Sequence, residues 1–269
     1  MIDINKIYCE DHLKTMARMP DDFVDMVLTS PPYDDLREYK GYTFDFESCA
    51  REIYRVLKVG GRVVWVVGDQ VRNFNRSLTS FKQTIRFQEI GFLVNDVIIY
   101  EKSTFSAPHA HLYHQTHEYM LVMSKEKPET FNPIVDKKNL WASHGAFGKN
   151  SFRGKDGFTK DASSSKKRKF FDDYGKRTNV WKLKTSAQEK PCQKIEHPAT
   201  FGLQLAKDHM YSWSNPGDLV YDPMAGSMTT ARAAIALERN FICSEISEEY
   251  VREFEPEVKA LQKQIRMAI

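Results

Sequence analysis

The sequence predicts an α/β fold with a doubly wound, mostly parallel sheet. Apolar runs typical of strands buried on both faces alternate with segments whose apolar residues recur at helical spacing. The chain has 269 residues, 41% hydrophobic and 28% charged, which is enough for one large domain with an insertion. The longest uninterrupted apolar runs, such as Val63 to Val67, are too short to span a bilayer, so no membrane segment is expected.

The first half of the chain contains most of the predicted strands. Phe23 to Thr29 is a near-continuous apolar run, and Gly60-Gly61 and Gly91 are expected to end helices. The predicted elements are an apolar stretch at Lys6 to Cys9, a helix through Leu13, Met16 and Met19, a strand at Phe23 to Thr29, a helix at Phe46 to Leu57, a strand at Arg62 to Val67, a helix at Thr79 to Ile90, and strands at Val94 to Tyr100 and Tyr119 to Ser124.

Regular structure is expected to resume near Thr200, after a long central segment. The predicted elements there are a helix from Thr200 to Met210, a strand at Leu219 to Asp222, a helix at Thr229 to Leu237, a strand at Phe241 to Glu245 and a final helix.

The central segment, 125–190, is strongly basic. It contains 17 Lys+Arg against 8 Asp+Glu, whereas the other 203 residues carry a net charge of −6. It is also rich in Gly and Ser and includes the run Lys166-Lys167-Arg168-Lys169. A basic, loop-rich insert on a slightly acidic core favours a polyanion-binding element. A solvated flexible loop is the alternative.

Cysteine usage indicates an intracellular protein. Cys9, Cys49, Cys192 and Cys243 lie far apart with no Cys-x-x-Cys pair, so reduced thiols are expected rather than disulfides or a zinc site. The N-terminal residues do not resemble a signal peptide, and we predict a cytoplasmic location.

One predicted strand end carries the most specific motif of the chain. The strand at Phe23 to Thr29 runs directly into Ser30-Pro31-Pro32-Tyr33. Successive prolines lack backbone donors and have a fixed φ, so their carbonyls are held in a rigid turn. The preceding hydroxyl and the following ring suit a flat group bearing an amine, because oxygens accept amine hydrogens and the ring stacks on the group. A plain Pro-Pro turn is the alternative.

A second strand end carries a small-residue loop. The strand ends at Asp222, and residues 223–228 lead into a helix opened by Thr229 and Thr230. The N-terminus of this helix can hold a carboxylate or phosphate through its N–H groups. Glu245 ends the next strand, at the spacing at which an acid binds the ribose hydroxyls of a nucleoside cofactor. The pattern is neither a P-loop nor a complete dinucleotide fingerprint.

Together these motifs resemble those of S-adenosylmethionine-dependent DNA amino-methyltransferases of the permuted, beta arrangement. In that family a Ser/Asp/Asn-Pro-Pro-Tyr/Phe motif precedes a target-recognition region, and the cofactor motif comes last, as in this sequence. The resemblance covers nearly all of the chain outside the insert and implies a Rossmann-like, circularly permuted core. It divides the chain into a catalytic half at 1–124, a target-recognition insert at 125–190 and a cofactor-binding half at 191–269.

The resemblance implies roles for individual residues. The implied catalytic residues are Ser30, Pro31, Pro32 and Tyr33. The implied contacts with S-adenosylmethionine are Asp11, Thr29, His197, Pro198, Thr200, Phe201, Asp222, Pro223, Met224, Gly226, Ser227, Thr229, Thr230 and Glu245. The family usually has a second glycine where Met228 stands, which predicts a lower cofactor affinity without loss of activity.

The implied reaction is methyl transfer to the exocyclic N4 amine of a flipped cytosine in double-stranded DNA. The Ser30 hydroxyl and Pro31 carbonyl would accept the amine hydrogens while Tyr33 stacks on the base. A first-position Ser resembles the cytosine-N4 members, whereas Asp suits adenine enzymes, so adenine-N6 methylation is the alternative. A non-catalytic DNA-binding module with a degenerate core is a second alternative. Glutamine and RNA methyltransferases normally have the opposite motif order.

DNA contacts are expected from the insert and from the histidines before it. We assign them to Lys166, Lys167, Arg168 and Lys169, and to His111 and His114. The four histidines at 109, 111, 114 and 117 do not match a tetrahedral zinc pattern, and no metal is expected. A homodimer and a cognate restriction endonuclease are both compatible with this arrangement.

Overall fold

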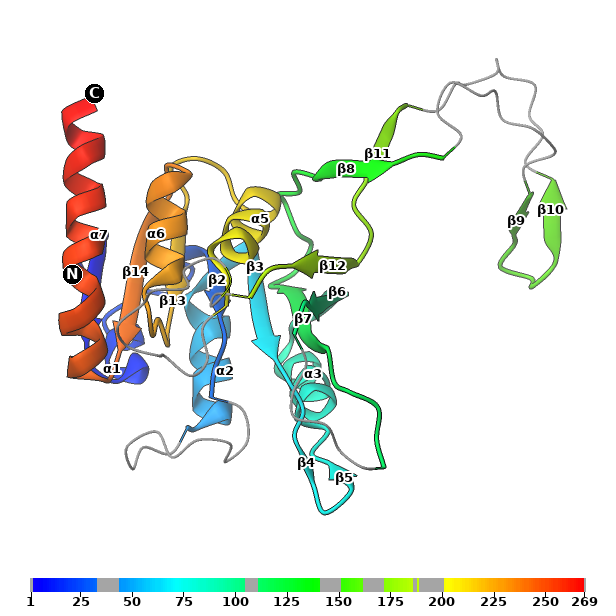
Figure 1. The fold of residues 1–269 in the computed structure, drawn as a ribbon, viewed down its shortest axis with the longest axis horizontal. Coiled ribbons are helices and arrows are strands. Elements are labelled where there is room, and N and C mark those ends of the chain that lie inside the picture. Colours follow the sequence, from blue (N-terminus) through cyan, green and yellow to red (C-terminus); the bar gives the residue numbers. More distant parts are fainter. Residues whose placement is uncertain are drawn as a thin grey trace. The chain divides into compact units, whose positions relative to one another are not determined.

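An eight-stranded mixed sheet organises the larger of two structural units (Figure 1). The computed structural model describes residues 2–32, 44–104, 111–140, 151–161, 172–185, 188 and 201–268. The larger unit comprises Met1–Asn132 with Asn179–Ile269, and the smaller one comprises Pro133–Thr178.

The sheet is mostly parallel, as predicted. In spatial order its strands are β1 (Lys6–Cys9), β14 (Asn240–Glu245), β13 (Leu219–Asp222), β2 (Val24–Thr29), β3 (Leu57–Val67), β7 (His117–Ser124), β6 (Leu93–Lys102) and β12 (Val180–Leu183). Only β7 runs against its neighbours, β3 and β6, and every other pair in this sheet is parallel.

Helices cover both faces of the sheet, which confirms the doubly wound architecture. They are α1 (His12–Met16), α2 (Phe46–Val56), α3 (Thr79–Ile90), α5 (Leu203–Trp213), α6 (Thr229–Ala236) and α7 (Glu248–Ala268). Adjacent strand residues point to opposite faces. Leu121 of β7 belongs to the core beneath α1, α2 and α3, whereas its neighbour Met120 contacts His209 of α5. Helices α6 and α7 follow α5 along that second face.

Aromatic side chains form the core between α2, α3 and the sheet. The Phe87 ring makes edge contacts with Phe46 at 5.1 Å, Trp65 at 5.1 Å and Phe92 at 5.3 Å between centroids. Trp65 is fully buried, and its indole N–H donates to Gln83 Oε1 at 2.9 Å. This pairing satisfies a polar group that burial would otherwise leave without a partner.

Two strands differ from the sequence prediction. Residues 57–61 extend β3, whereas the sequence prediction placed Leu57 in a helix that Gly60-Gly61 would end. The strand begins earlier because Leu57 pairs with Val24 of β2. Strand β12 lies inside the predicted insert, yet it pairs with β6 of the main sheet. Its Trp181 is buried and stacks on His209 of α5 at 4.5 Å.

The smaller unit, Pro133–Thr178, lies within the predicted insert of 125–190. Its described residues form two short antiparallel pairs, β8 (Val135–Lys138) with β11 (Tyr174–Lys176) and β9 (Ser151–Arg153) with β10 (Thr159–Asp161). By sequence this unit contains 12 Lys+Arg against 5 Asp+Glu. Its role in target recognition stays a prediction. In the described parts of the chain, no helix is long and apolar enough to cross a membrane.

Candidate active site

Parallel strands bring the predicted site residues to one edge of the sheet. Strands β1, β14, β13, β2 and β3 all run in the same direction, so their carboxyl ends meet at that edge. The register places Cys9 beside Glu245 and Asp222 beside Cys243. Ser30 follows the neighbouring strand β2 directly. This edge is where open α/β sheets bind their ligands.

Asp222 is a buried carboxylate at the end of β13. Its Oδ1 accepts the Met224 N–H at 3.1 Å, and its Oδ2 accepts the Thr230 hydroxyl at 2.5 Å. Burial raises the pKa of Asp222 to about 6, although these bonds and the Thr29 hydroxyl oppose the rise. At neutral pH the carboxyl is therefore mostly ionised, although burial makes this charge unfavourable.

Glu245 ties the end of β14 to the small-residue loop. One carboxylate oxygen accepts the Gly226 N–H at 2.8 Å, and the other accepts the Ser247 N–H at 2.8 Å. Burial raises the pKa of Glu245 above its ordinary value. Since a carboxylate has about four lone-pair sites, its two oxygens can still accept further hydroxyl donors.

These two acids fit a cationic ligand. Neither Asp222 nor Glu245 forms an ion pair with a Lys or Arg side chain within the described residues. Two buried carboxylates left without a counter-charge are unfavourable, and a bound cation would relieve that cost. A sulfonium-bearing nucleoside has both the positive charge and the ribose hydroxyls that such a pair can accept.

The loop between β13 and α6 has an unusual backbone. Gly226 and Met228 both have left-handed φ values, +49° and +60°. Met228 stands where the resembled family has a glycine, and its side chain is completely buried. The left-handed conformation costs about 1–2 kcal/mol for a residue with a Cβ atom. Burial of the Met228 side chain offsets that cost, so the loop turns tightly without the second glycine.

Arg232 supports this loop from α6, a role that the sequence analysis missed. Its Nη2 donates to Thr229 Oγ1 at 3.2 Å, and its Nη1 lies 3.4 Å from Glu257 of α7. Thr229 in turn shares a hydrogen bond of 3.1 Å with the Ser227 hydroxyl. A lone Arg in an amphipathic helix has no distinctive sequence signal. The support that Arg232 gives the loop is therefore visible only in the structure, where its side chain is buried beside the loop.

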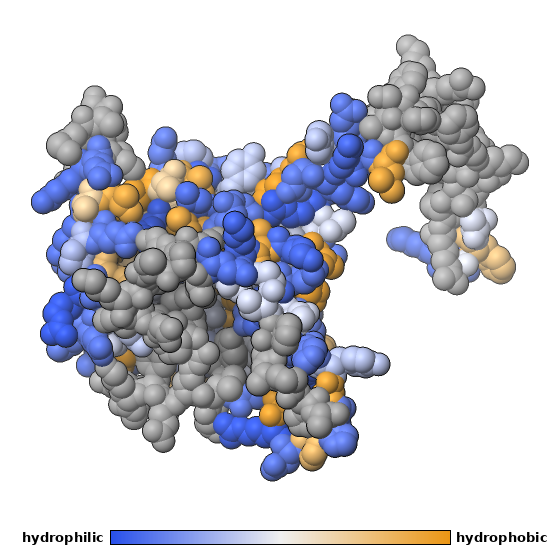
Figure 2. All heavy atoms as spheres, in the orientation of Figure 1, coloured by the Kyte–Doolittle hydropathy of each residue, from blue (hydrophilic) through white to orange (hydrophobic). Residues whose placement is uncertain are grey.

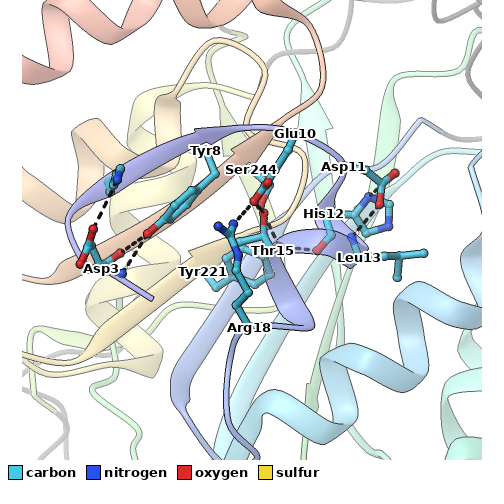
Figure 3. Close-up of polar contacts among 11 residues, drawn as sticks. Asp3, Tyr8, Glu10, Asp11, His12, Leu13, Thr15, Arg18, Tyr221 and Ser244 are labelled. Atoms are coloured by element: carbon cyan, nitrogen blue, oxygen red, sulfur yellow. Dashed lines mark hydrogen bonds and ion pairs between the residues drawn. The ribbon is translucent and has the colours of Figure 1, made fainter. Parts of the chain in front are cut away.

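Asp11 lies just beyond β1, beside the end of β14 (Figure 3). Its carboxylate caps α1 by accepting the Leu13 N–H at 2.8 Å, and its other oxygen lies 3.9 Å from His12 Nδ1. Burial lowers the pKa of His12, whose Nε2 has no hydrogen-bond partner among the described residues. The His12 carbonyl accepts the Tyr221 hydroxyl at 3.4 Å, which links this segment to β13.

The Ser-Pro-Pro motif follows β2 at the same edge. Thr29 and Pro31 are buried, whereas Ser30 and Pro32 are partly exposed. Met224 packs against the main core, and Phe201 is half-buried just before α5. Pro223 is buried in the loop after β13. The other predicted residues of this site lie outside the described residues: Tyr33, His197, Pro198 and Thr200.

The predicted DNA-contacting residues are only partly described. Lys166, Lys167, Arg168 and Lys169 lie outside the described residues. His111 and His114 are exposed, and the His111 ring lies 5.7 Å from the ring of Phe74.

Comparison with known proteins identifies the family. The model of the N6/N4 DNA methylase family matches residues 24–256. The chain belongs to this family. It is 44% identical over 229 residues to the orphan methyltransferase M.BamHII of Bacillus amyloliquefaciens, covering 84% of this chain and 85% of the relative. It is also 30% identical to the type II methyltransferase M.BglII of Bacillus subtilis, covering 92% of this chain and 67% of that protein.

Solved structures confirm the fold. The cytosine-N4-specific PvuII DNA methyltransferase matches with a TM-score of 0.66 at 19% identity, covering 97% of this chain and 92% of that one. A putative DNA modification methylase of Thermus thermophilus, solved with S-adenosyl-L-methionine, matches with a TM-score of 0.61 at 23% identity and 95% coverage of both chains. The chain is thus a DNA methyltransferase of the N6/N4 family with a Rossmann-like core.

Proposed function

We propose that the chain transfers a methyl group from S-adenosylmethionine to the N4 amine of a flipped cytosine in duplex DNA. The observation that carries this proposal is the placement of Ser30 and Pro31 at the carboxyl end of β2. The next strand in the sheet is β13, which ends at the buried acid Asp222, and beyond it lies β14, which ends at the buried acid Glu245. The oxygens that would accept the hydrogens of the target amine therefore lie near the acids that would bind a cationic nucleoside, at the same edge of the sheet.

The acids and the loop would hold the cofactor. Glu245 has acceptor capacity for ribose hydroxyls, and Asp222 would offset positive charge next to the loop. Asp11, at the end of β1, would accept hydrogens from the adenine amine. When bound, S-adenosylmethionine would supply an activated methyl group: its carbon–sulfur bond breaks to leave a neutral thioether, and the methylated amine gives up one proton to solvent.

The Ser-Pro-Pro turn would prepare the target amine. The lone pair of an exocyclic amine is delocalised into the base, so the amine must be drawn toward tetrahedral geometry before it attacks. The Ser30 hydroxyl and the Pro31 carbonyl would accept its two hydrogens and orient the lone pair in line with the methyl group. The rigid Pro-Pro backbone would keep the Pro31 carbonyl in place without reorganisation during the reaction.

The choice of cytosine rests on Ser30, the first residue of the motif. The PvuII enzyme, described as cytosine-N4-specific, shares the fold. The Escherichia coli protein YhdJ, described as a DNA adenine methyltransferase, is also related at 26% identity. Adenine-N6 methylation is therefore the second candidate.

Modification-aware sequencing tests the proposal. DNA from cells that express the wild-type chain should contain one recurrent sequence methylated at the cytosine amine, and this experiment also identifies the recognition sequence. The control is Ser30→Ala, which should lower methyl transfer by about 10² or more because the lost bond forms mainly in the transition state. Cofactor affinity of this variant should be nearly unchanged. Wild-type activity in Ser30→Ala would contradict the role of Ser30.

A further inference from the structure

A hairpin with an exposed aromatic tip extends from the edge of the sheet that carries the site. It consists of β4 (Val71–Arg72) and β5 (Asn75–Arg76), which pair antiparallel. It follows β3, whose Trp65 pairs with Thr29 of β2, so the hairpin begins just beyond the level of Ser30. Figure 1 shows β4 and β5 projecting from the end of β3, away from the sheet.

The turn at the tip has an unusual backbone. Asn73 and Phe74 connect the strands with left-handed φ values of +48° and +62°. A two-residue turn of this kind strongly prefers glycine at its second position, and a bulky side chain there is an outlier. Phe74 is 66% exposed, and its ring lies 5.7 Å from the ring of His111, so most of the Phe74 side chain faces solvent. Backbone strain at a largely exposed aromatic residue is characteristic of functional positions.

The base of the hairpin is anchored to rigid elements. The Ser77 N–H donates to the Gln70 carbonyl at 3.0 Å. Asp69, just before the hairpin, accepts both the N–H and the hydroxyl of Ser80 at the start of α3, at 2.9 and 3.0 Å. Gln115 bridges Arg76 and the Asp69 carbonyl at 3.0 and 3.3 Å. The tip is therefore presented in a fixed direction.

Two arginines flank the tip on opposite faces of the hairpin. Arg76 pairs with Val71 and Arg72 pairs with Asn75, and adjacent pairs point to opposite faces. Both arginines are exposed. Hydrophilic residues border hydrophobic ones over this end of the molecule (Figure 2). An aromatic ring between two cations suits nucleic acid, in which bases stack on rings and phosphates bind guanidinium groups.

We propose that the β4–β5 hairpin enters the DNA duplex at the target base, with Phe74 filling the space that the flipped base leaves. Arg72 and Arg76 bind backbone phosphates on the two sides of that space. Apolar side chains inserted between base steps are an established way of offsetting unstacking. The proposal rests on the proposed function, because only an enzyme that extracts a base creates such a space.

The decisive variant is Phe74→Gly, because glycine adopts the left-handed conformation freely. Its thermal midpoint should equal or exceed that of the wild type. Its methylation rate on a fully paired duplex should fall about tenfold or more. On a duplex with an abasic site opposite the target base, its rate should fall less than about threefold, because most of the unpairing cost is already absent. Tyr211→Ala, which removes an exposed ring of α5, is the matched control and should change neither rate.

A second readout does not depend on methyl transfer. With 2-aminopurine at the target position, wild-type binding should increase fluorescence as the base leaves the stack, and Phe74→Gly should reduce that increase. Arg72→Ala and Arg76→Ala should each reduce the steepness of the slope of log DNA affinity against log salt concentration by about 1.

The outcomes separate the two proposals. If the wild type methylates the paired duplex and Phe74→Gly matches it, or loses equal activity on both duplexes, the hairpin proposal is wrong and the proposed function stands. If the wild type methylates neither duplex, the proposed function fails and the hairpin proposal falls with it.

Discussion

Replacing Asp222 by asparagine should stabilise the protein at neutral and alkaline pH. The carboxyl is 1% exposed, and its pKa rises from an ordinary 3.8 to about 6. The pKa of this carboxyl is higher in the folded state than in the unfolded state, so the protonated carboxyl favours folding. Its contribution to the free energy of unfolding is complete below about pH 4 and is lost as pH rises through about 6. Above pH 6 the protein therefore folds around an unfavourably buried charge.

The size of the effect follows from this pKa. A change from 3.8 to about 6 corresponds to about 3 kcal/mol at pH 8. Asparagine keeps an acceptor for the Met224 N–H and offers a donor to the Thr230 hydroxyl, so the rearranged bonds should forfeit only about 1 kcal/mol. The net gain of about 2 kcal/mol corresponds to a rise of about 4–8 °C in thermal midpoint.

Thermal denaturation of both proteins between pH 5 and pH 8, without ligand, measures this difference. The advantage of Asp222→Asn should be largest at pH 8 and should shrink toward zero at pH 5, where the wild-type carboxyl is largely protonated. The gain in midpoint on adding S-adenosylmethionine should be smaller in the variant. A stability difference that is constant across this pH range, or an Asp222→Asn protein that is less stable at pH 8, would refute the reasoning.

Two further predictions concern the loop and the insert. Met228→Gly relieves a left-handed conformation but removes a fully buried side chain, so urea denaturation should show a net loss of about 1–3 kcal/mol; a gain in stability would mean that strain dominates. Replacing Lys166, Lys167, Arg168 and Lys169 together by alanine should flatten the log–log salt dependence of DNA affinity by up to about 3–4, on specific and random duplexes alike. Equal slopes of log DNA affinity against log salt concentration for wild type and variant would show that this run does not contact phosphates.

Local signals predicted much of the fold. Helix α3 spans Thr79–Ile90, as predicted. It ends there because Gly91 adopts a positive φ of 125°. The extension of β3 back to Leu57 was not predictable, since pairing with Val24 across the sheet overrides the local signal of Gly60-Gly61. Strand β12 was missed because only Trp181 among its residues is deeply buried, so it lacks a strand-like apolar run.

The site shows the same division between local and tertiary information. Strand direction places Asp222, Glu245 and Ser30 at the carboxyl ends of their strands, and the pairing of β13 with β14 and with β2 brings these ends together at one edge. Their roles in the site stay predictions. The bonds from Gly226 and Ser247 to Glu245 depend on how the loop closes on the strand end. The left-handed Met228 is likewise a consequence of packing, because only burial of its side chain makes that conformation tolerable.

Nucleoside mass spectrometry tests the central claim most directly. Purified wild-type protein is incubated with S-adenosylmethionine and unmethylated duplex DNA, and the DNA is then digested to nucleosides, with Ser30→Ala treated in parallel. The account predicts N4-methyldeoxycytidine from the wild type and at least about 10²-fold less from the variant. N6-methyldeoxyadenosine instead would contradict the assignment of cytosine from Ser30, and no methylated nucleoside at all would contradict the proposed methyl transfer.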